Sequence, residues 1–122
     1  MLRPRLIVSL LLSNNALVKT INFKDPKYIG DPLNAVRIFN EKNVDELFIA
    51  DIDVTREKKR PNFNLISKIS QECRMPICYG GGIKNIEDIE RIINSGVEKV
   101  SISSAFFENP LFKKLFMKLK SD

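Results

Sequence analysis

The sequence predicts an α/β fold in which parallel strands alternate with helices that pack outside them. Four short apolar runs alternate with stretches of helical periodicity, and Val44–Ile49 matches Val97–Ile102 in residue type at every step except the fifth, which indicates an internal repeat. The 122 residues, 43% of them hydrophobic, suffice for one domain but not for a complete (β/α)8 barrel of roughly 250 residues. We therefore expect residues 1–122 to form a single domain.

The first half of the chain predicts two β-α units. The apolar run Leu6–Leu12 predicts a buried strand, because residues 13–15 are turn-forming and offer no small-residue cleavage site for a signal peptide. A polar loop follows. Asp31 before Pro32 then predicts a helix start, with a carboxylate as N-cap and proline at the first helical position. The apolar run Leu47–Ala50 predicts the second strand.

The second half of the chain repeats this order. The predicted elements are a helix from Pro61, a strand over 75–79, a helix from Asn85, a strand over 97–103 and a helix from Asn109-Pro110. Strands that alternate with helices are parallel and are joined by right-handed crossovers. The predicted architecture is therefore (β/α)4, one half of a TIM-type (β/α)8 barrel with outer helices.

The composition excludes several kinds of chemistry. Without histidine, the chain holds no imidazole base, no Ser-His-Asp or Cys-His system and no His-ligated metal. Cys73 and Cys78 suggest neither a disulfide framework nor a metal cluster, so we expect a reduced, cytoplasmic setting without metal or cofactor. The formal charge of +5 permits anionic partners, but lysines on solvated helix faces give the same charge. Neither nucleic-acid binding nor a membrane span is expected.

Glycines and serines after the third and fourth strands predict a phosphate site. In parallel α/β folds, ligands bind where strands end and helices begin. Gly81 and Gly82 allow backbone amides to approach an anion at the start of a helix. Ser103 and Ser104 add hydroxyls and amides from the neighbouring loop. A tight turn without a ligand is the alternative, and it stays open.

Two carboxylates and one lysine are further candidates at the same end of the strands. Asp51 and Asp53 flank the end of the second strand, and alternation sends them to opposite sides, so only one can point into a central site. We favour Asp51, with a helix-capping or loop-fixing carboxylate as the alternative. Lys19 lies in the first loop and either reaches an anion or is an ordinary solvated lysine.

A second set of charged residues lies at the opposite ends of the strands. Arg5, Glu46 and Lys99 each stand at the start of a strand, and the internal repeat makes Glu46 and Lys99 equivalent. Residues in phase at strand starts form one layer of a parallel barrel. We therefore expect these three side chains to form a partly buried ring of paired charges. Ordinary surface ion pairing is the alternative.

Segments spread over nearly the whole chain carry a family resemblance. They are Arg5 with the following strand, Leu17–Lys19, Asn22-Phe23, Gly30–Pro32, Val44–Leu47, Asp51-Ile52, Gly80–Ile83, Val97–Ile102 and Glu108–Pro110. In this order they closely resemble the first half of the cyclase subunit of imidazole glycerol phosphate synthase. That family is a (β/α)8 barrel thought to derive from two fused halves. It takes ammonia from a glutaminase docked at the bottom of the barrel and uses it at the top for imidazole ring closure and ribonucleotide cleavage.

The resemblance implies roles for individual residues at both ends of the barrel. Arg5, Glu46 and Lys99 match three members of the charged gate at the ammonia entrance, whose fourth member is a glutamate of the second half. Phosphate-binding positions are matched by Gly82, Ser103 and Ser104, with Ser103 in place of the usual asparagine. Polar active-site positions are matched by Lys19 and Asp51.

Leu11 is the important departure from the family. It occupies the position of the first catalytic aspartate, and leucine cannot transfer a proton. The second acid-base group of the family belongs to the other half of the barrel. Residues 10–12, 17–20, 27–32 and 35–42 are more similar to a cyclase-like paralogue found in surface-polysaccharide clusters, which pairs with a glutaminase and feeds ammonia to a sugar amidotransferase.

The resemblance therefore favours ammonia channelling over cyclase chemistry. A histidine-biosynthesis cyclase, as a fragment or as half of a split enzyme, is one alternative. A non-catalytic half-barrel that binds a phosphorylated small molecule is another. The expected partners are a glutaminase subunit and either a second copy of the chain or a complementary half-barrel, because four parallel strands leave an edge and an apolar face uncovered.

Overall fold

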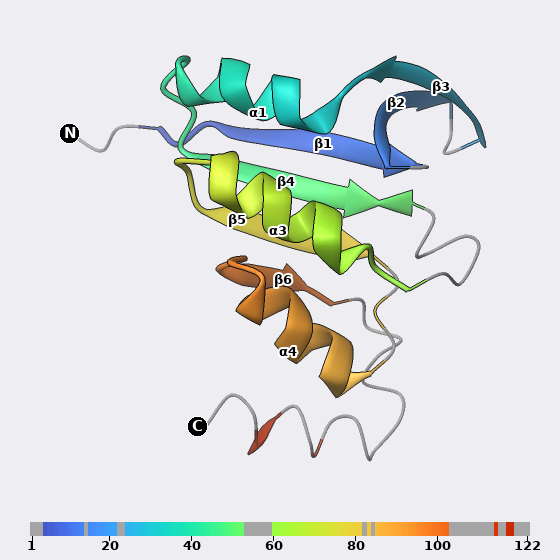
Figure 1. Cartoon of the computed structure of the whole chain (residues 1–122), viewed down its shortest axis with the longest axis vertical. Coiled ribbons are helices and arrows are strands. Elements are labelled where there is room, and N and C mark those ends of the chain that lie inside the picture. Colours follow the sequence, from blue (N-terminus) through green and yellow to red (C-terminus); the bar gives the residue numbers. More distant parts are fainter. Residues whose placement is uncertain are drawn as a thin grey trace.

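The chain forms a sheet with helices on one of its faces (Figure 1). The computed structural model describes residues 4–13, 15–21, 24–52, 60–81, 83, 85–102, 114, 117 and 118. The described elements are β1 (Ile7–Ser13), β2 (Ala16–Ile21), β3 (Lys24–Gly30), α1 (Pro32–Asn40), β4 (Glu46–Asp51), α3 (Phe63–Glu72), β5 (Ile77–Gly81), α4 (Ile86–Asn94) and β6 (Lys99–Ser101).

The strand order confirms the predicted fold class. The sheet runs β3-β2-β1-β4-β5-β6, and β1, β4, β5 and β6 pair in parallel. Helices α1, α3 and α4 lie side by side on the same face, as expected for strand-helix-strand crossovers (Figure 1). The carboxyl ends of the parallel strands therefore share one edge of the sheet, and the amino ends share the other.

The expected polar loop between the first strand and the first helix is wrong. The segment forms β2 and β3, an antiparallel hairpin that extends the sheet beyond β1. Asn15 lies in the turn between β1 and β2, and its φ of 61° is a left-handed conformation that asparagine adopts readily. Leu17 and Val18 are buried, and this short apolar pair supports a strand even though the surrounding sequence is polar.

Alternation along the central strands separates two faces of the sheet. On β4, Leu47 and Ile49 are fully buried in the core with the helices, whereas Glu46, Phe48 and Ala50 are only half-buried. The core includes Leu10, Leu12, Val36, Ile66, Ile69, Ile77, Tyr79, Ile89 and Ile92. Burial of each such apolar side chain stabilises the fold by about 1.5–3 kcal/mol relative to exposure. The face away from the helices carries Glu46 and Lys99, whereas Asp51 is in phase with Leu47 and Ile49 on the side of the helices.

Asparagine and aspartate side chains fix the starts of the helices. The side chain of Asp31 accepts from the amide of Leu33, and that of Asn85 accepts from the amide of Asp88, so both predicted N-caps are confirmed. Asn62 caps α3, which begins at Phe63, two residues after the predicted start at Pro61. The predicted helix from Asn109-Pro110 and the end of the predicted fourth strand at Ser103 lie outside the described residues.

Candidate functional site

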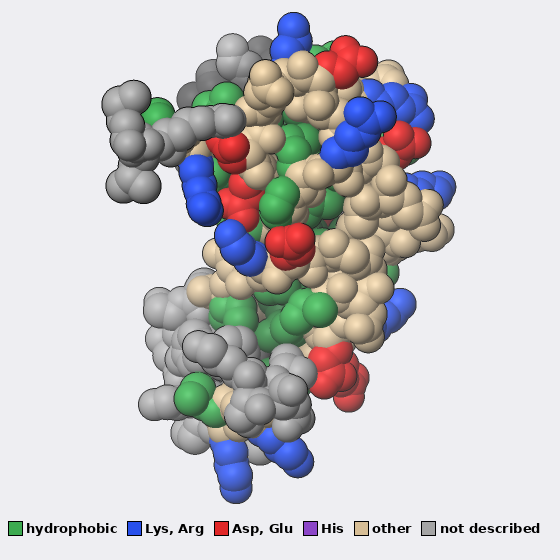
Figure 2. All heavy atoms as spheres, turned by 90° about the vertical axis from the view of Figure 1, so that its left-hand side faces the viewer, with side chains coloured by type: hydrophobic (Ala, Val, Ile, Leu, Met, Phe, Trp, Pro, Cys, Tyr) green, Lys and Arg blue, Asp and Glu red, His purple; other side chains and the backbone are tan. Residues whose placement is uncertain are grey.

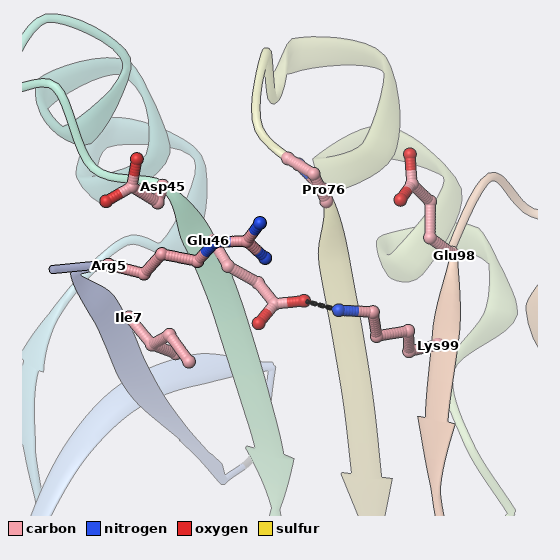
Figure 3. Close-up of a pocket in the computed structure, with 7 residues that line it drawn as sticks. All are labelled: Arg5, Ile7, Asp45, Glu46, Pro76, Glu98 and Lys99. Carbon is pink, nitrogen blue, oxygen red and sulfur yellow. Dashed lines mark hydrogen bonds and ion pairs between the residues drawn. The ribbon is translucent and has the colours of Figure 1, made fainter. Parts of the chain in front are cut away.

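An ion pair crosses the amino end of the parallel sheet. Glu46 is the first residue of β4 and Lys99 the first of β6, with β5 between them. The ammonium Nζ of Lys99 lies 2.8 Å from the carboxylate Oε1 of Glu46 (Figure 3). Both side chains rise from the face away from the helices, so the contact joins two strands that share no hydrogen bonds. The structure therefore brings these two candidates together, and Arg5 approaches them from the start of β1 (Figure 3).

A cavity of about 400 Å3 surrounds this ion pair. Its lining consists of Arg5, Ile7, Asp45, Glu46, Pro76, Glu98 and Lys99. Figure 2 looks onto this end of the sheet, where acidic and basic side chains lie beside one another and beside hydrophobic ones. The cavity is therefore a polar mouth of mixed charge at the amino ends of the strands, large enough for a small hydrogen-bonding molecule.

The two partners of the ion pair differ in exposure. The side chain of Glu46 is 16% exposed and that of Lys99 is 59% exposed. The hydrogen bond to Glu46 raises the pKa of the Lys99 ammonium, and the nearby Arg5 guanidinium acts in the opposite direction. An ion pair with one solvated partner adds little to stability. A solvent-exposed ammonium therefore lies over a sheltered carboxylate.

Asp45 joins the beginnings of β1 and β4 beside this cavity. Its carboxylate Oδ2 accepts from the backbone amide of Leu6 at 2.7 Å. Its own amide donates to the carbonyl of Leu6 at 2.9 Å. No sequence signal indicated this role of Asp45, because a charged residue before a strand is common and its partner Leu6 is distant in sequence.

Phe48 lies on the same face, two residues beyond Glu46. A Cβ atom added to Gly80 would meet the Phe48 ring at 2.9 Å and the Cβ of Ser101 at 3.3 Å. The first of these distances is too short for carbon atoms in contact. Glycine at position 80 therefore lets the ring of Phe48 extend across β5 towards β6.

The carboxyl end of β4 carries a hydrogen bond between Asp51 and Tyr79. The phenol of Tyr79 donates to Oδ2 of Asp51 at 3.0 Å. Tyr79 is fully buried, and this burial, followed by the neighbouring carboxylate, raises its pKa well above the ordinary value. Tyr79 therefore stays a neutral donor that orients Asp51. Such a contact fits the loop-fixing alternative for Asp51, and its role at a ligand site stays a prediction.

Leu11 is half-buried and alternates with the buried Leu10 and Leu12. It pairs in register with Ala50 of β4, near the carboxyl edge of the sheet. It therefore lies on the face away from the helices, where a catalytic side chain would need to be.

The predicted phosphate site is only partly within the described residues. Gly81 ends β5 and pairs in register with Asp51. Gly82, Ser103 and Ser104 lie outside the described residues, as does Asp53. For Lys19 the structure gives the backbone alone, which belongs to β2 and pairs with Lys27. The phosphate site therefore stays a prediction.

Cys73 and Cys78 are free thiols, and burial raises the pKa of each. Among the described residues no group of three His, Cys, Asp or Glu side chains is placed to hold a metal ion. Within the same part of the chain, no helix is long and apolar enough to cross a bilayer.

Comparison with known proteins decides the family. Residues 5–122 match the model of a family described as histidine biosynthesis protein. The chain belongs to this family. A protein of Leptospira borgpetersenii, named provisionally as imidazole glycerol phosphate synthase subunit HisF, is 59% identical over 110 residues, which are 90% of this chain and 43% of the relative. The imidazole glycerol phosphate synthase subunit HisF of Lactococcus lactis is 42% identical over 112 residues, or 92% of this chain and 43% of the relative.

These matches confirm the relationship to HisF-type cyclase subunits that the sequence resemblance indicated. A third relative, the HisF subunit of Flavobacterium johnsoniae, is 36% identical over 90% of this chain. The chain spans about two fifths of the length of these histidine biosynthesis relatives, 42–44% in each case. The described β-α order matches one half of the barrel that the family forms.

Proposed function

We propose that this chain forms the ammonia-receiving half of a HisF-like barrel. Ammonia released by a glutaminase enters through the cavity at the amino ends of the strands and leaves at their carboxyl ends, where a sugar amidotransferase of surface-polysaccharide biosynthesis uses it. The observation that carries this proposal is the ion pair of Glu46 and Lys99 across β5, at the bottom of an open polar cavity.

The chemistry of ammonia suits this cavity. Ammonia is small and neutral, donates hydrogen bonds to carboxylates and accepts them from ammonium groups. Glu46 and Lys99 provide one group of each kind, 2.8 Å apart. Lys99 has the exposure to swing away from Glu46 and back. A docked glutaminase would exclude water from this end, which strengthens each electrostatic contact.

Leu11 favours delivery over catalysis. A cyclase needs an acid-base group at this position, and a hydrocarbon side chain neither gives nor takes a proton. The face of the sheet between the two ends carries Phe48, Cys78 and Gly80, with Ser9 and Ser101 paired beside them. In this proposal the chain conducts ammonia, and the sugar amidotransferase carries out the amination.

Histidine-biosynthesis cyclase activity is the second candidate. It is favoured by the names of the HisF subunits of Lactococcus lactis and Flavobacterium johnsoniae, which match along 92% and 90% of this chain. Leu11 argues against it. Cyclase turnover by the chain with its glutaminase that is lost in Asp51→Asn would replace the delivery proposal.

Isotope transfer tests the delivery proposal. The chain, its glutaminase and the amidotransferase are supplied with glutamine labelled with 15N in the amide and with excess unlabelled ammonium. Conduction predicts a labelled sugar product. Glu46→Gln and Lys99→Met should lower the labelled fraction towards that of the bulk ammonium.

The matched control is Glu72→Gln, which removes an exposed ion pair with Arg37 between α1 and α3; neither residue lines the cavity. It should leave the label unchanged. Equal labelling in wild type, Glu46→Gln and Lys99→Met would show that ammonia does not pass this ion pair.

A further inference from the structure

The segment that carries Arg5 is held by contacts at its backbone. Pro4, Arg5, Leu6 and Ile7 are all exposed, with Leu6 at 55% and Ile7 at 52%. Burial therefore does not fix this segment. The parallel ladder between β1 and β4 begins only at Ile7, which pairs with Glu46. Arg5 lies before the ladder, yet its side chain is directed over the cavity (Figure 3).

Asp45 attaches the segment before β1 to the start of β4 through hydrogen bonds with Leu6. Its Oδ2 accepts from the Leu6 amide at 2.7 Å, and the Leu6 carbonyl accepts from the amides of Asp45 and Glu46 at 2.9 and 3.3 Å. Both peptide groups that flank Leu6 are thereby tied to the start of β4. A hydrogen bond to a carboxylate is about twice as strong as one between neutral groups. The peptide that follows Arg5 is thus fixed relative to Glu46.

We propose that Asp45 is a positioning residue that holds Arg5 beside the Glu46–Lys99 ion pair at the mouth of the cavity. The inference deepens the proposed function, because an entrance of defined charge needs all three side chains in place. The proposed role of Asp45 can be tested without ammonia. It requires only that the position of Arg5 depend on a hydrogen-bond acceptor in the side chain at position 45.

Lys99 reports where Arg5 lies. The hydrogen bond and charge of Glu46 raise the pKa of Lys99, and Cys78 adds to this effect, while the positive charge of Arg5 opposes it. Asp45 and Glu98 are the other charged residues that line the cavity. Removing Arg5 therefore raises the pKa of Lys99 further only where Arg5 is held close to it.

The test measures the Nζ titration of Lys99 by NMR in the full chain. Arg5→Ala is introduced into wild type, Asp45→Asn and Asp45→Ala. Asparagine keeps an acceptor oxygen for the Leu6 amide, whereas alanine removes it. Arg5→Ala should raise the pKa of Lys99 in wild type and in Asp45→Asn, and should change it by less than half as much in Asp45→Ala. Because each comparison lies within one background, the lost charge of Asp45 cancels.

Hydrogen exchange provides a second measurement. Loss of the hydrogen bond to the Asp45 carboxylate should make the Leu6 amide exchange faster by about tenfold or more in Asp45→Ala. Asp45→Asn should retain most of the protection. Where the alanine variant fails to fold, Asp45→Glu displaces the carboxylate by one methylene and serves as the third background.

An equal response of Lys99 to Arg5→Ala in all backgrounds would overturn the inference. Since neither measurement uses ammonia or a glutaminase, the result is separate from that of the isotope experiment. An effect at Lys99 together with unchanged isotope transfer would keep Asp45 as a positioning residue and reject the delivery function.

Discussion

Replacing Tyr79 by phenylalanine removes one hydroxyl and leaves the buried ring in place. The hydroxyl donates to Asp51 at 3.0 Å, and the ring itself is fully buried. A hydrogen bond to a charged group contributes about 1.5–3 kcal/mol when its loss is uncompensated. Asp51 is only half-buried, so water takes over part of the donor's role. We therefore expect Tyr79→Phe to lower the free energy of unfolding by about 1–1.5 kcal/mol.

Urea denaturation measures this loss. With a slope of about 1.5–2 kcal/mol/M, the midpoint should fall by about 0.5–1 M while the slope stays constant. Asp51→Ala provides the matched background, because it removes the acceptor. In that background Tyr79→Phe should leave the free energy of unfolding unchanged or raise it slightly, since the buried hydroxyl has lost this partner. An equal cost of Tyr79→Phe in both backgrounds would refute the assignment of the bond.

Three further outcomes follow from the same core. Above about pH 10 the unfolded chain loses the Tyr79 proton while the folded chain keeps it, because burial raises the folded pKa. The contribution of neutral Tyr79 to the free energy of unfolding, measured by urea titration, should therefore be fully present below about pH 10 and should be lost as the pH rises. In Tyr79→Phe the free energy of unfolding should fall less steeply with pH. Ser70→Ala should raise the free energy of unfolding by about 1 kcal/mol, because the buried hydroxyl of Ser70 has no hydrogen-bond partner among the described residues; a lower urea midpoint would contradict this. Gly80→Ala should cost about 1–3 kcal/mol by displacing the Phe48 ring, and Phe48→Leu should recover part of that loss in the double variant.

Local sequence signals were sufficient for most of the parallel core. The apolar runs that became β4 and β5 are bounded by charge, proline or glycine, and their length leaves little choice but a buried strand. The caps at Asp31 and Asn85 stood directly before helical periodicity. The β2–β3 hairpin escaped prediction because its polar residues outnumber the buried pair of Leu17 and Val18.

The candidate site was predictable only where it depends on the repeat. The equivalence of Glu46 and Lys99 placed both at strand starts, and the structure has them in contact. Their function as an ammonia entrance stays a prediction. The hydrogen bonds of Asp45 with Leu6 and of Tyr79 with Asp51 join residues that are distant in sequence, and no local sequence pattern predicts such pairs.

The packing of Phe48 on Gly80 has an evolutionary consequence. Any relative that gains a side chain at position 80 must shorten the one at position 48, because both cannot occupy the space over β5. A change at either site alone passes through a less stable intermediate. The two positions should therefore vary together among relatives, and a large aromatic residue at 48 should occur only with glycine at 80.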